Sequence, residues 1–317
     1  MSRIFDALQR SQADSPMPRA ATPVQPESAE GVTSVPEHGD GQAFAPQTAA
    51  AQATAAVQAP VDWLSVPPER MLHPHPTPEQ RIITLTNHNG AGAEMFRVLG
   101  TRLAHMKDKR PLSKLLVSSA VGDEGKSVVA VNLAIALAQR PVERVLLVEA
   151  DLRRPTASLL LSPSPTVGIT EWHQGKLDIQ KALYQVTDLP LWFLSAGAGI
   201  TEPLPILESL EFANMLDAVS AHFDWVVLDC TPMLPMADAA SLSRLSDGVL
   251  VVVREGYTRR RMLNKALETI DRKKLLGLVF NDAASQQVNY DRFGGYSYYG
   301  NNKKGSEQGD QGKAATA

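Results

Sequence analysis

The chain has 317 residues, of which 31 are basic and 34 acidic, so its formal net charge is -3. This balance excludes a generally basic nucleic-acid-binding protein, and the single cysteine, Cys230, excludes an internal disulfide framework or a cysteine-based zinc site. A single cysteine fits a reducing compartment, so we expect a cytoplasmic protein, and no apolar run approaches the roughly 20 residues that cross a bilayer.

Proline dominates the first part of the chain. Twelve of the 22 prolines fall before residue 81, and alanine, glutamine and serine fill the spaces between them. This composition buries too little apolar surface to fold, which predicts a disordered linker over residues 12–80. Residues 1–11 differ, because three apolar side chains share one face of a possible helix. The short amphipathic segment docks on a partner or on its own domain, or is a frayed end; its apolar residues are Ile4, Phe5 and Leu8.

Apolar runs alternate with helical patterns from residue 81 onward. Short apolar runs separated by amphipathic helices are typical of βαβ units that form a parallel sheet covered on both faces. We therefore predict an α/β fold with a doubly wound, mostly parallel sheet over residues 81–300, followed by a disordered tail at 301–317. The expected strands are 114–119, 144–149, 191–194, 225–229, 248–253 and 275–280, and the expected helices are 93–106, 127–139, 207–222, 237–243 and 259–272.

The strongest chemical signal is the segment Ala120–Ser127, AVGDEGKS, which lies between an expected strand and an expected helix. It has the spacing of a P-loop, in which backbone N–H groups and a helix N-terminus surround bound phosphates. Lys126 would neutralise the phosphates and the Ser127 hydroxyl would bind Mg²⁺; the alternative is a chance match in a glycine-containing turn. The predicted nucleotide-binding residues are Gly122, Asp123, Glu124, Gly125, Lys126, Ser127 and Val128.

A second strand end carries an acid that suits the same site. The apolar run 225–229 ends in Asp229, and the carboxyl ends of parallel strands border the ligand crevice of α/β sheets. Asp229 would hold Mg²⁺ directly or through water; the alternative is a loop aspartate that caps the next helix. The neighbouring Cys230 is expected to be a small buried residue.

A third strand end carries two acids. Glu149 closes the run 144–149 and Asp151 follows it, so at a spacing of two both side chains point to one face. Two carboxylates on one face repel each other unless a metal or a proton-transfer role compensates. Structural ion pairing is the alternative, because Arg153 and Arg154 follow at once. We predict that one acid holds metal and the other acts as a base for an acceptor hydroxyl.

Together these segments resemble the bacterial tyrosine kinases of capsule and exopolysaccharide synthesis. Those kinases have a P-loop fold related to the chromosome-partitioning and division-site-placing ATPases. The resemblance covers about residues 90–300. It is carried by SSAVGDEGKS, VLLVEADLRRP and VVLDCTP, which are similar to the Walker A, A′ and B motifs of the family, and by two later segments, VVVREGYTRRR and LGLVFNDA.

The resemblance implies a protein-tyrosine kinase that uses ATP and Mg²⁺. An asparagine like Asn281 contacts the adenine in the related ATPases. Arg153 would stabilise charge on the transferring phosphoryl group or hold the carboxylates. The implied catalytic residues are Lys126, Glu149 as the base, Asp151, Arg153 and Asp229, and the implied metal ligands are Ser127, Asp151 and Asp229.

The C-terminus adds a tyrosine cluster, since four of the six tyrosines of the chain lie within YDRFGGYSYYG. A flexible tyrosine tail resembles the autophosphorylation cluster of these kinases and could reach the active site of a neighbouring subunit. The alternative is an aromatic low-complexity end that packs or associates weakly. The predicted phosphoacceptors are Tyr290, Tyr296, Tyr298 and Tyr299.

Three motifs depart from the family pattern. Gly122-Asp123 replaces the usual Pro-Gly of Walker A. Glu149 stands where the family usually has aspartate, and the extra methylene moves the predicted base by about an ångström, enough to disturb a near-attack geometry. In the ring-forming motif E-x2-R-x2-R, Glu94 and Arg97 match but the third position is Gly100, which puts ring assembly through that motif in doubt.

The resemblance further implies regulation of polysaccharide polymerisation and export. The implied partners are a membrane-embedded chain-length regulator, or co-polymerase, whose cytoplasmic segment activates the kinase, a second copy of the chain in a homo-oligomer or ATP-dependent dimer, and an opposing tyrosine phosphatase. The protein would then lie at the inner face of the plasma membrane through its partner. Two other functions stay open: a P-loop ATPase switch without kinase activity, and a nucleotide-binding pseudokinase scaffold.

Overall fold

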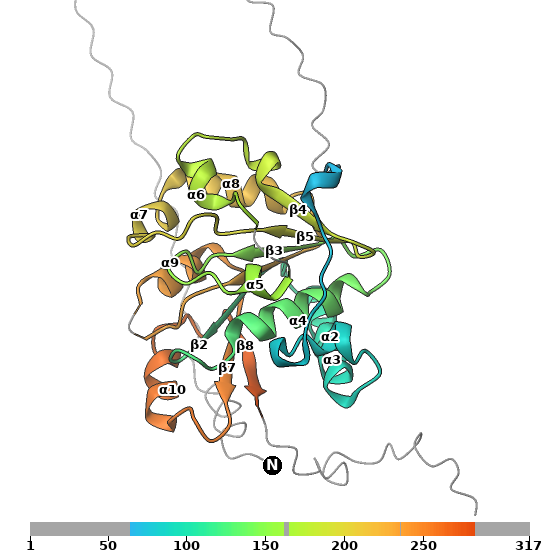
Figure 1. The fold of residues 1–317 in the computed structure, drawn as a ribbon. Helices are drawn as coiled ribbons and strands as arrows, with labels where there is room; N and C mark the ends of the chain where they lie inside the picture. The colour runs from blue at the N-terminus through green and yellow to red at the C-terminus, as the bar shows by residue number, and fades with distance from the viewer. Residues whose placement is uncertain (1–63, 162–164, 235, 283–317) are drawn as a thin grey trace, which may run out of the picture. The chain divides into compact units, whose positions relative to one another are not determined.

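The computed structural model describes residues 64–161, 165–234 and 236–282, which build an α/β unit (Figure 1). Its eight-stranded sheet has the order β1-β4-β5-β3-β6-β2-β7-β8. Neighbouring strands are parallel except for β4 and β5, which form an antiparallel pair. The strands are β1 (Met71–Leu72), β2 (Lys114–Ser119), β3 (Val145–Glu149), β4 (Leu183–Val186), β5 (Leu191–Leu194), β6 (Trp225–Asp229), β7 (Gly248–Arg254) and β8 (Leu275–Asn281).

The central strands are apolar along their whole length because both faces of the sheet are covered. All residues of β3 and β6 are buried. Alternate side chains enter two separate apolar clusters: Leu116 packs in one, whereas Leu115 and Val117 pack in the other. This is the period-two pattern of a strand inside a two-sided core. The predicted mostly parallel, doubly wound sheet is therefore confirmed.

The helices divide between the two faces of the sheet (Figure 1). α2 to α5 contribute to one apolar cluster, and α6 to α10 contribute to the other. The helices are α2 (Ile83–Thr86), α3 (Ala91–Lys107), α4 (Lys126–Ala138), α5 (Ala157–Leu161), α6 (Ile169–His173), α7 (Leu204–Leu207), α8 (Leu210–Ser220), α9 (Asp238–Leu245) and α10 (Arg260–Leu267), with 3₁₀ turns at Pro68–Arg70, Pro78–Gln80 and Ile179–Ala182.

The start of the folded unit differs from the prediction. Residues 64–80, which we expected to belong to the linker, include β1, and this strand pairs in parallel with β4 at the edge of the sheet. The Leu72 carbonyl oxygen accepts hydrogen bonds from the backbone N–H and the hydroxyl of Thr187, at 2.9 and 2.7 Å. The two-residue apolar run Met71–Leu72 was too short to stand out among the prolines. The segments 1–11 and 301–317, and most of the predicted linker, lie outside the described residues.

The sheet order brings the three predicted motifs together. β6 lies between β3 and β2, so the loops that follow these parallel strands meet at one edge. In register, Asp229 of β6 is opposite Val117 of β2 and Glu149 of β3. In the part of the chain that the structure describes, none of the helices has the length and hydropathy to cross a membrane.

Candidate nucleotide and metal site

The loop between β2 and α4 is shaped to receive an anion. Gly125 precedes α4 with a φ of 84° and leaves the first turn of the helix without a side-chain cap, so its N–H groups are available to phosphate oxygens. Asp123 has a φ of 60°, at the position where the resembled family usually has glycine. Aspartate is one of the few residues that adopt this conformation readily. A Cβ on Gly122 would meet nothing within 4 Å.

Residues from β7, β8 and the loop after β7 hold this loop in place. The buried Glu124 carboxylate accepts a hydrogen bond from the Val121 N–H at 2.9 Å and another from the Thr258 hydroxyl. The Asn281 side-chain amide donates to the Glu124 carbonyl oxygen at 2.9 Å. Arg254 donates to the Asp123 carbonyl oxygen at 3.3 Å. Glu124 and Asn281 thus brace the loop, and the adenine contact expected for Asn281 stays a prediction.

Lys126 lies among carboxylates. Its Nζ forms an ion pair with Asp151 at 3.0 Å and approaches the Ser127 hydroxyl at 3.5 Å. Burial opposes the ammonium charge, but nearby Asp229 and Asp151 outweigh that cost and raise the pKa of Lys126. Asp151 also accepts the Arg154 N–H at 3.1 Å. Lys126, Ser127, Asp151 and Asp229 therefore form a compact charged cluster at the N-terminus of α4.

Asp229 is the unusual member of this cluster. Its side chain is fully buried, and neither carboxylate oxygen has a hydrogen-bond partner among the described residues. Burial raises the pKa of Asp229 to about 7, although the charge of Lys126 favours the ionised form. An unpaired buried carboxylate is costly unless a ligand completes it.

The cluster fits a hard divalent cation. Mg²⁺ prefers oxygen ligands and commonly uses one or two carboxylates together with substrate phosphates. The described residues contain no group of three or more His, Cys, Asp or Glu that would form a preformed metal cage. Two carboxylates, a hydroxyl and an adjacent phosphate cradle are the donor set expected of a metal that arrives with a nucleotide.

Glu149, the predicted base, is held outside this cluster. Its Oε1 accepts hydrogen bonds from the N–H and hydroxyl of Ser158, at 3.0 and 3.3 Å. Its Oε2 accepts the Ala196 N–H at 3.2 Å and the Ser195 hydroxyl at 3.4 Å. Burial raises the pKa of Glu149 despite these bonds. The carboxylate thus joins β3 to α5 and to the loop after β5, which suits a structural role, and the base role of Glu149 stays a prediction.

Arg153 is paired with a residue that sequence reasoning did not single out. Its guanidinium forms a 2.8 Å ion pair with Asp238 at the start of α9. The only sequence signal for Asp238 was its place at the beginning of an expected helix, where acids are common. Val128 lies in the first turn of α4. The predicted phosphoacceptors Tyr290, Tyr296, Tyr298 and Tyr299 lie outside the described residues.

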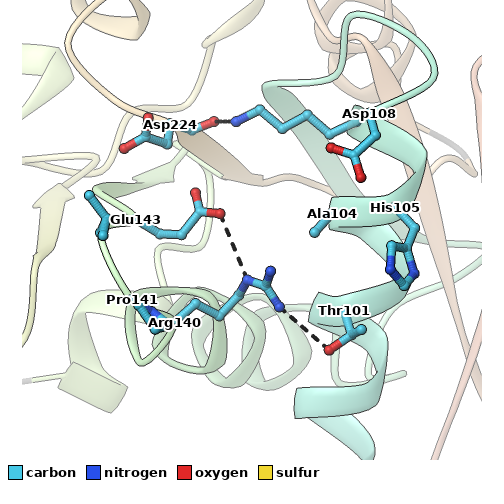
Figure 2. Close-up of a pocket in the computed structure, with 10 residues that line it drawn as sticks. Thr101, Ala104, His105, Asp108, Arg140, Pro141, Glu143 and Asp224 are labelled. Carbon is cyan, nitrogen blue, oxygen red and sulfur yellow. Dashed lines mark hydrogen bonds and ion pairs between the residues drawn. The ribbon is translucent and has the colours of Figure 1, made fainter.

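A separate hollow of about 560 Å³ lies between the end of α3 and the turn that connects α4 to β3 (Figure 2). Arg140 crosses it, with contacts to Glu143 at 3.8 Å and to the Thr101 hydroxyl at 3.4 Å. Glu143 and Asp224 precede β3 and β6, so the hollow is at the amino ends of these strands. Ligands of open α/β sheets bind at the carboxyl ends, and the hollow is therefore not the phosphate site.

Comparison with known proteins agrees with this geometry. An AAA domain family model matches residues 114–276. Tyrosine-protein kinase YwqD of Bacillus subtilis is 30% identical over 224 residues, which cover 70% of this chain and 92% of YwqD. Succinoglycan biosynthesis transport protein ExoP of Rhizobium meliloti is 31% identical over 213 residues, 65% of this chain and 27% of ExoP. The kinase domain of Escherichia coli tyrosine kinase ETK aligns with a TM-score of 0.61 and 25% identity, covering 70% of this chain and 85% of that domain.

Proposed function

The chain belongs to the AAA domain family and to the bacterial tyrosine kinases, and from this premise we propose how its site transfers phosphate. The protein is a protein-tyrosine kinase of the group that serves exopolysaccharide and capsule synthesis. We propose that ATP with Mg²⁺ is the phosphate donor. The observation that carries this proposal is the unpaired, fully buried Asp229 carboxylate beside Lys126.

Each residue of the cluster has a distinct task in this proposal. The N–H groups of the P-loop and Lys126 hold the phosphates, and the residues that would hold the metal are Ser127, Asp151 and Asp229. Bound ATP would supply the γ-phosphoryl group, and the Mg²⁺ bound with it would offset the negative charge of that group. Positioning and electrostatic stabilisation dominate catalysis of phosphoryl transfer, so a site built from fixed charges suits the reaction.

The base is reassigned in the proposal. The Glu149 carboxylate already accepts hydrogen bonds from Ser158, Ser195 and Ala196. Asp151 is the other acid of the pair, and it faces Lys126. We therefore propose that Asp151 serves the acceptor hydroxyl as well as the metal, while Glu149 fixes the surrounding loops.

The acceptors and partners follow from the family rather than from the described residues. We propose that the tyrosines from Tyr290 to Tyr299 are phosphorylated in trans by another copy of the chain. Regulation would come from the cytoplasmic segment of a membrane-embedded polysaccharide co-polymerase, which would bring the kinase to the inner face of the plasma membrane, and a tyrosine phosphatase would oppose it. The related protein ExoP carries succinoglycan biosynthesis transport in its own name.

One observation favours the second candidate, an ATPase switch that does not transfer phosphate to protein. Gly100, at the third position of the ring-forming motif, is buried in α3, and a Cβ there would lie 3.4 Å from Leu137. Glu94 and Arg97 pair with each other at 2.7 Å. The helix therefore lacks the second arginine that the family uses between subunits.

Phosphotyrosine mapping by mass spectrometry separates the two functions. Purified full-length protein is incubated with Mg-ATP, with and without the cytoplasmic segment of a candidate co-polymerase, and Lys126→Ala is the control. The kinase predicts Lys126-dependent phosphate on tyrosines between 290 and 299. ATP turnover with no phosphotyrosine in either condition would establish the ATPase switch instead, and ATP binding without turnover would establish the scaffold.

A further inference from the structure

Arg153 and Asp238 join two loops that border the site. Arg153 follows Asp151 in the loop after β3, and Asp238 is the first residue of α9, which follows β6. The Arg153 Nε and Nη2 atoms donate to the two Asp238 oxygens at 2.8 and 3.3 Å, and Nη1 donates to the Thr201 carbonyl oxygen at 2.8 Å. The Asp238 side chain is only 1% exposed. The bidentate geometry therefore fixes both the place and the plane of the guanidinium.

The segment that carries Asp238 is itself tied to the P-loop. The Met233 N–H donates to the Ser119 carbonyl oxygen at 2.8 Å, and the Leu234 N–H donates to that of Ala120 at 3.2 Å. The N-terminus of α9 also favours a carboxylate at its first position. Asp238 is thus held firmly in place. Arg153 stays where it is as long as it keeps its hydrogen bonds to Asp238.

Besides Asp238, the charges of Asp151 and Glu202 act on Arg153, and of these two Asp151 belongs to the charged cluster. The hydrogen bonds that Arg153 donates to Asp238 are the main cause of its raised pKa, and the charge of Asp151 contributes to it. A guanidinium released from Asp238 would find in Asp151 a carboxylate that is now held by Lys126 at 3.0 Å. An Arg153–Asp151 pair would compete directly with a metal ion for the same oxygens.

We propose that Asp238 is a positioning residue that keeps Arg153 away from Asp151, and so leaves Asp151 available to nucleotide-bound Mg²⁺. The inference rests on the proposed function, which gives Asp151 its metal role. If Asp238 only fastened α9 to the β3 loop, its loss would change stability and leave the Mg²⁺ requirement unchanged.

Calorimetric binding of ADP across a Mg²⁺ titration tests this role without phosphate transfer. We expect Asp238→Asn to raise the Mg²⁺ concentration for half-maximal enhancement of ADP binding by about tenfold, as for other residues that orient metal ligands. The double variant Arg153→Met/Asp238→Asn should return to within about twofold of wild type, because the competing guanidinium is gone. Asp238→Glu keeps the charge but displaces the guanidinium, so it should lie between wild type and Asp238→Asn.

The outcomes are decisive in both directions. An unchanged Mg²⁺ requirement in Asp238→Asn overturns the inference, as does a double variant that stays as impaired as the single one. If Asp238→Asn does not fold, Asp238→Glu decides by the same comparison with wild type. Wild-type protein that binds Mg-ADP but transfers no phosphate would refute the kinase proposal, while the Asp238 comparison would remain readable.

Discussion

Two buried acids at neighbouring strand ends have opposite surroundings. Glu149 of β3 and Asp229 of β6 lie opposite each other in register, and both side chains are fully buried. Ser158, Ser195 and Ala196 satisfy the Glu149 carboxylate, whereas Asp229 has no hydrogen-bond partner among residues that the structure describes. The two carboxylates are buried to the same extent, so the neighbouring hydrogen-bond donors decide the role of each. A satisfied acid stabilises the fold, and an unsatisfied acid is available to a ligand.

The largest expected effect comes from removing the unsatisfied charge. Asp229→Asn should lower phosphate transfer at least about 100-fold, since a fixed charge at the reacting centre is lost. The fold should persist, because the amide occupies the same space. Steady-state transfer assays at saturating Mg-ATP measure the loss. Asp217→Asn is the matched control, because Asp217 is an exposed acid on α8, and it should retain wild-type activity.

Substitution of the satisfied acid, Glu149, should lower stability. Glu149→Ala leaves the Ser158 and Ala196 N–H groups buried without acceptors, which should lower the free energy of unfolding by about 3 kcal/mol. Glu149→Gln keeps the size and one acceptor oxygen, so it should lose clearly less. Urea denaturation at pH 7 gives both values. Equal stability of Glu149→Ala and wild type would refute the structural role.

Stability of the nucleotide-free protein should depend on pH through Asp229. Its pKa is about 7 in the folded protein, against the ordinary value of 3.8, so near neutral pH the folded protein retains a proton that the unfolded chain releases. Stability from this group is present at low pH and is lost as pH rises toward and through 7. Between pH 6 and 8 the expected loss is about 1.4 kcal/mol.

Urea denaturation at the two pH values measures this loss. Asp229→Asn is the control, because it removes the titrating group and should remove that part of the pH dependence. An identical pH dependence in wild type and Asp229→Asn would mean that the pKa of Asp229 lies outside this pH range.

The smallest expected effect concerns one donor to Glu149. Ser158→Ala removes a hydroxyl bond of 3.3 Å but keeps the backbone bond of 3.0 Å to the same oxygen. The free energy of unfolding should fall by about 0.5–1 kcal/mol. Thermal denaturation in parallel with Glu149→Ala places the two on one scale. A loss as large as that of Glu149→Ala would mean that the hydroxyl, and not the backbone, carries the interaction.

Much of the fold could be predicted from local patterns. Apolar runs located β2, β3, β5, β6, β7 and β8 to within one residue, because strands covered on both faces are apolar throughout. β1 and β4 were missed. β1 is only two residues long, and β4, with the sequence LYQV, pairs antiparallel with β5. Both depend on pairing partners rather than on a local signal of their own.

The site was predictable in part and for the same reason. The P-loop spacing located Lys126 and Ser127, and strand ends located Asp151 and Asp229. The contacts of Glu149 were not predictable, because Ser158 and Ala196 lie 9 and 47 residues away along the chain. Asp238 lies 85 residues from Arg153, and no motif connects the two. Long-range pairing decided which acid was satisfied.

Phosphate transfer by Glu149→Gln tests the difference between the two acids most directly. The rate is measured at a temperature at which the variant is fully folded, beside wild type and Asp229→Asn, with saturating Mg-ATP. If Glu149 has a structural role, the rate of Glu149→Gln should stay within about threefold of wild type. A base contributes at least about 100-fold to such a reaction. Folded Glu149→Gln that loses as much activity as Asp229→Asn would contradict this structural role. The base role would then return to Glu149.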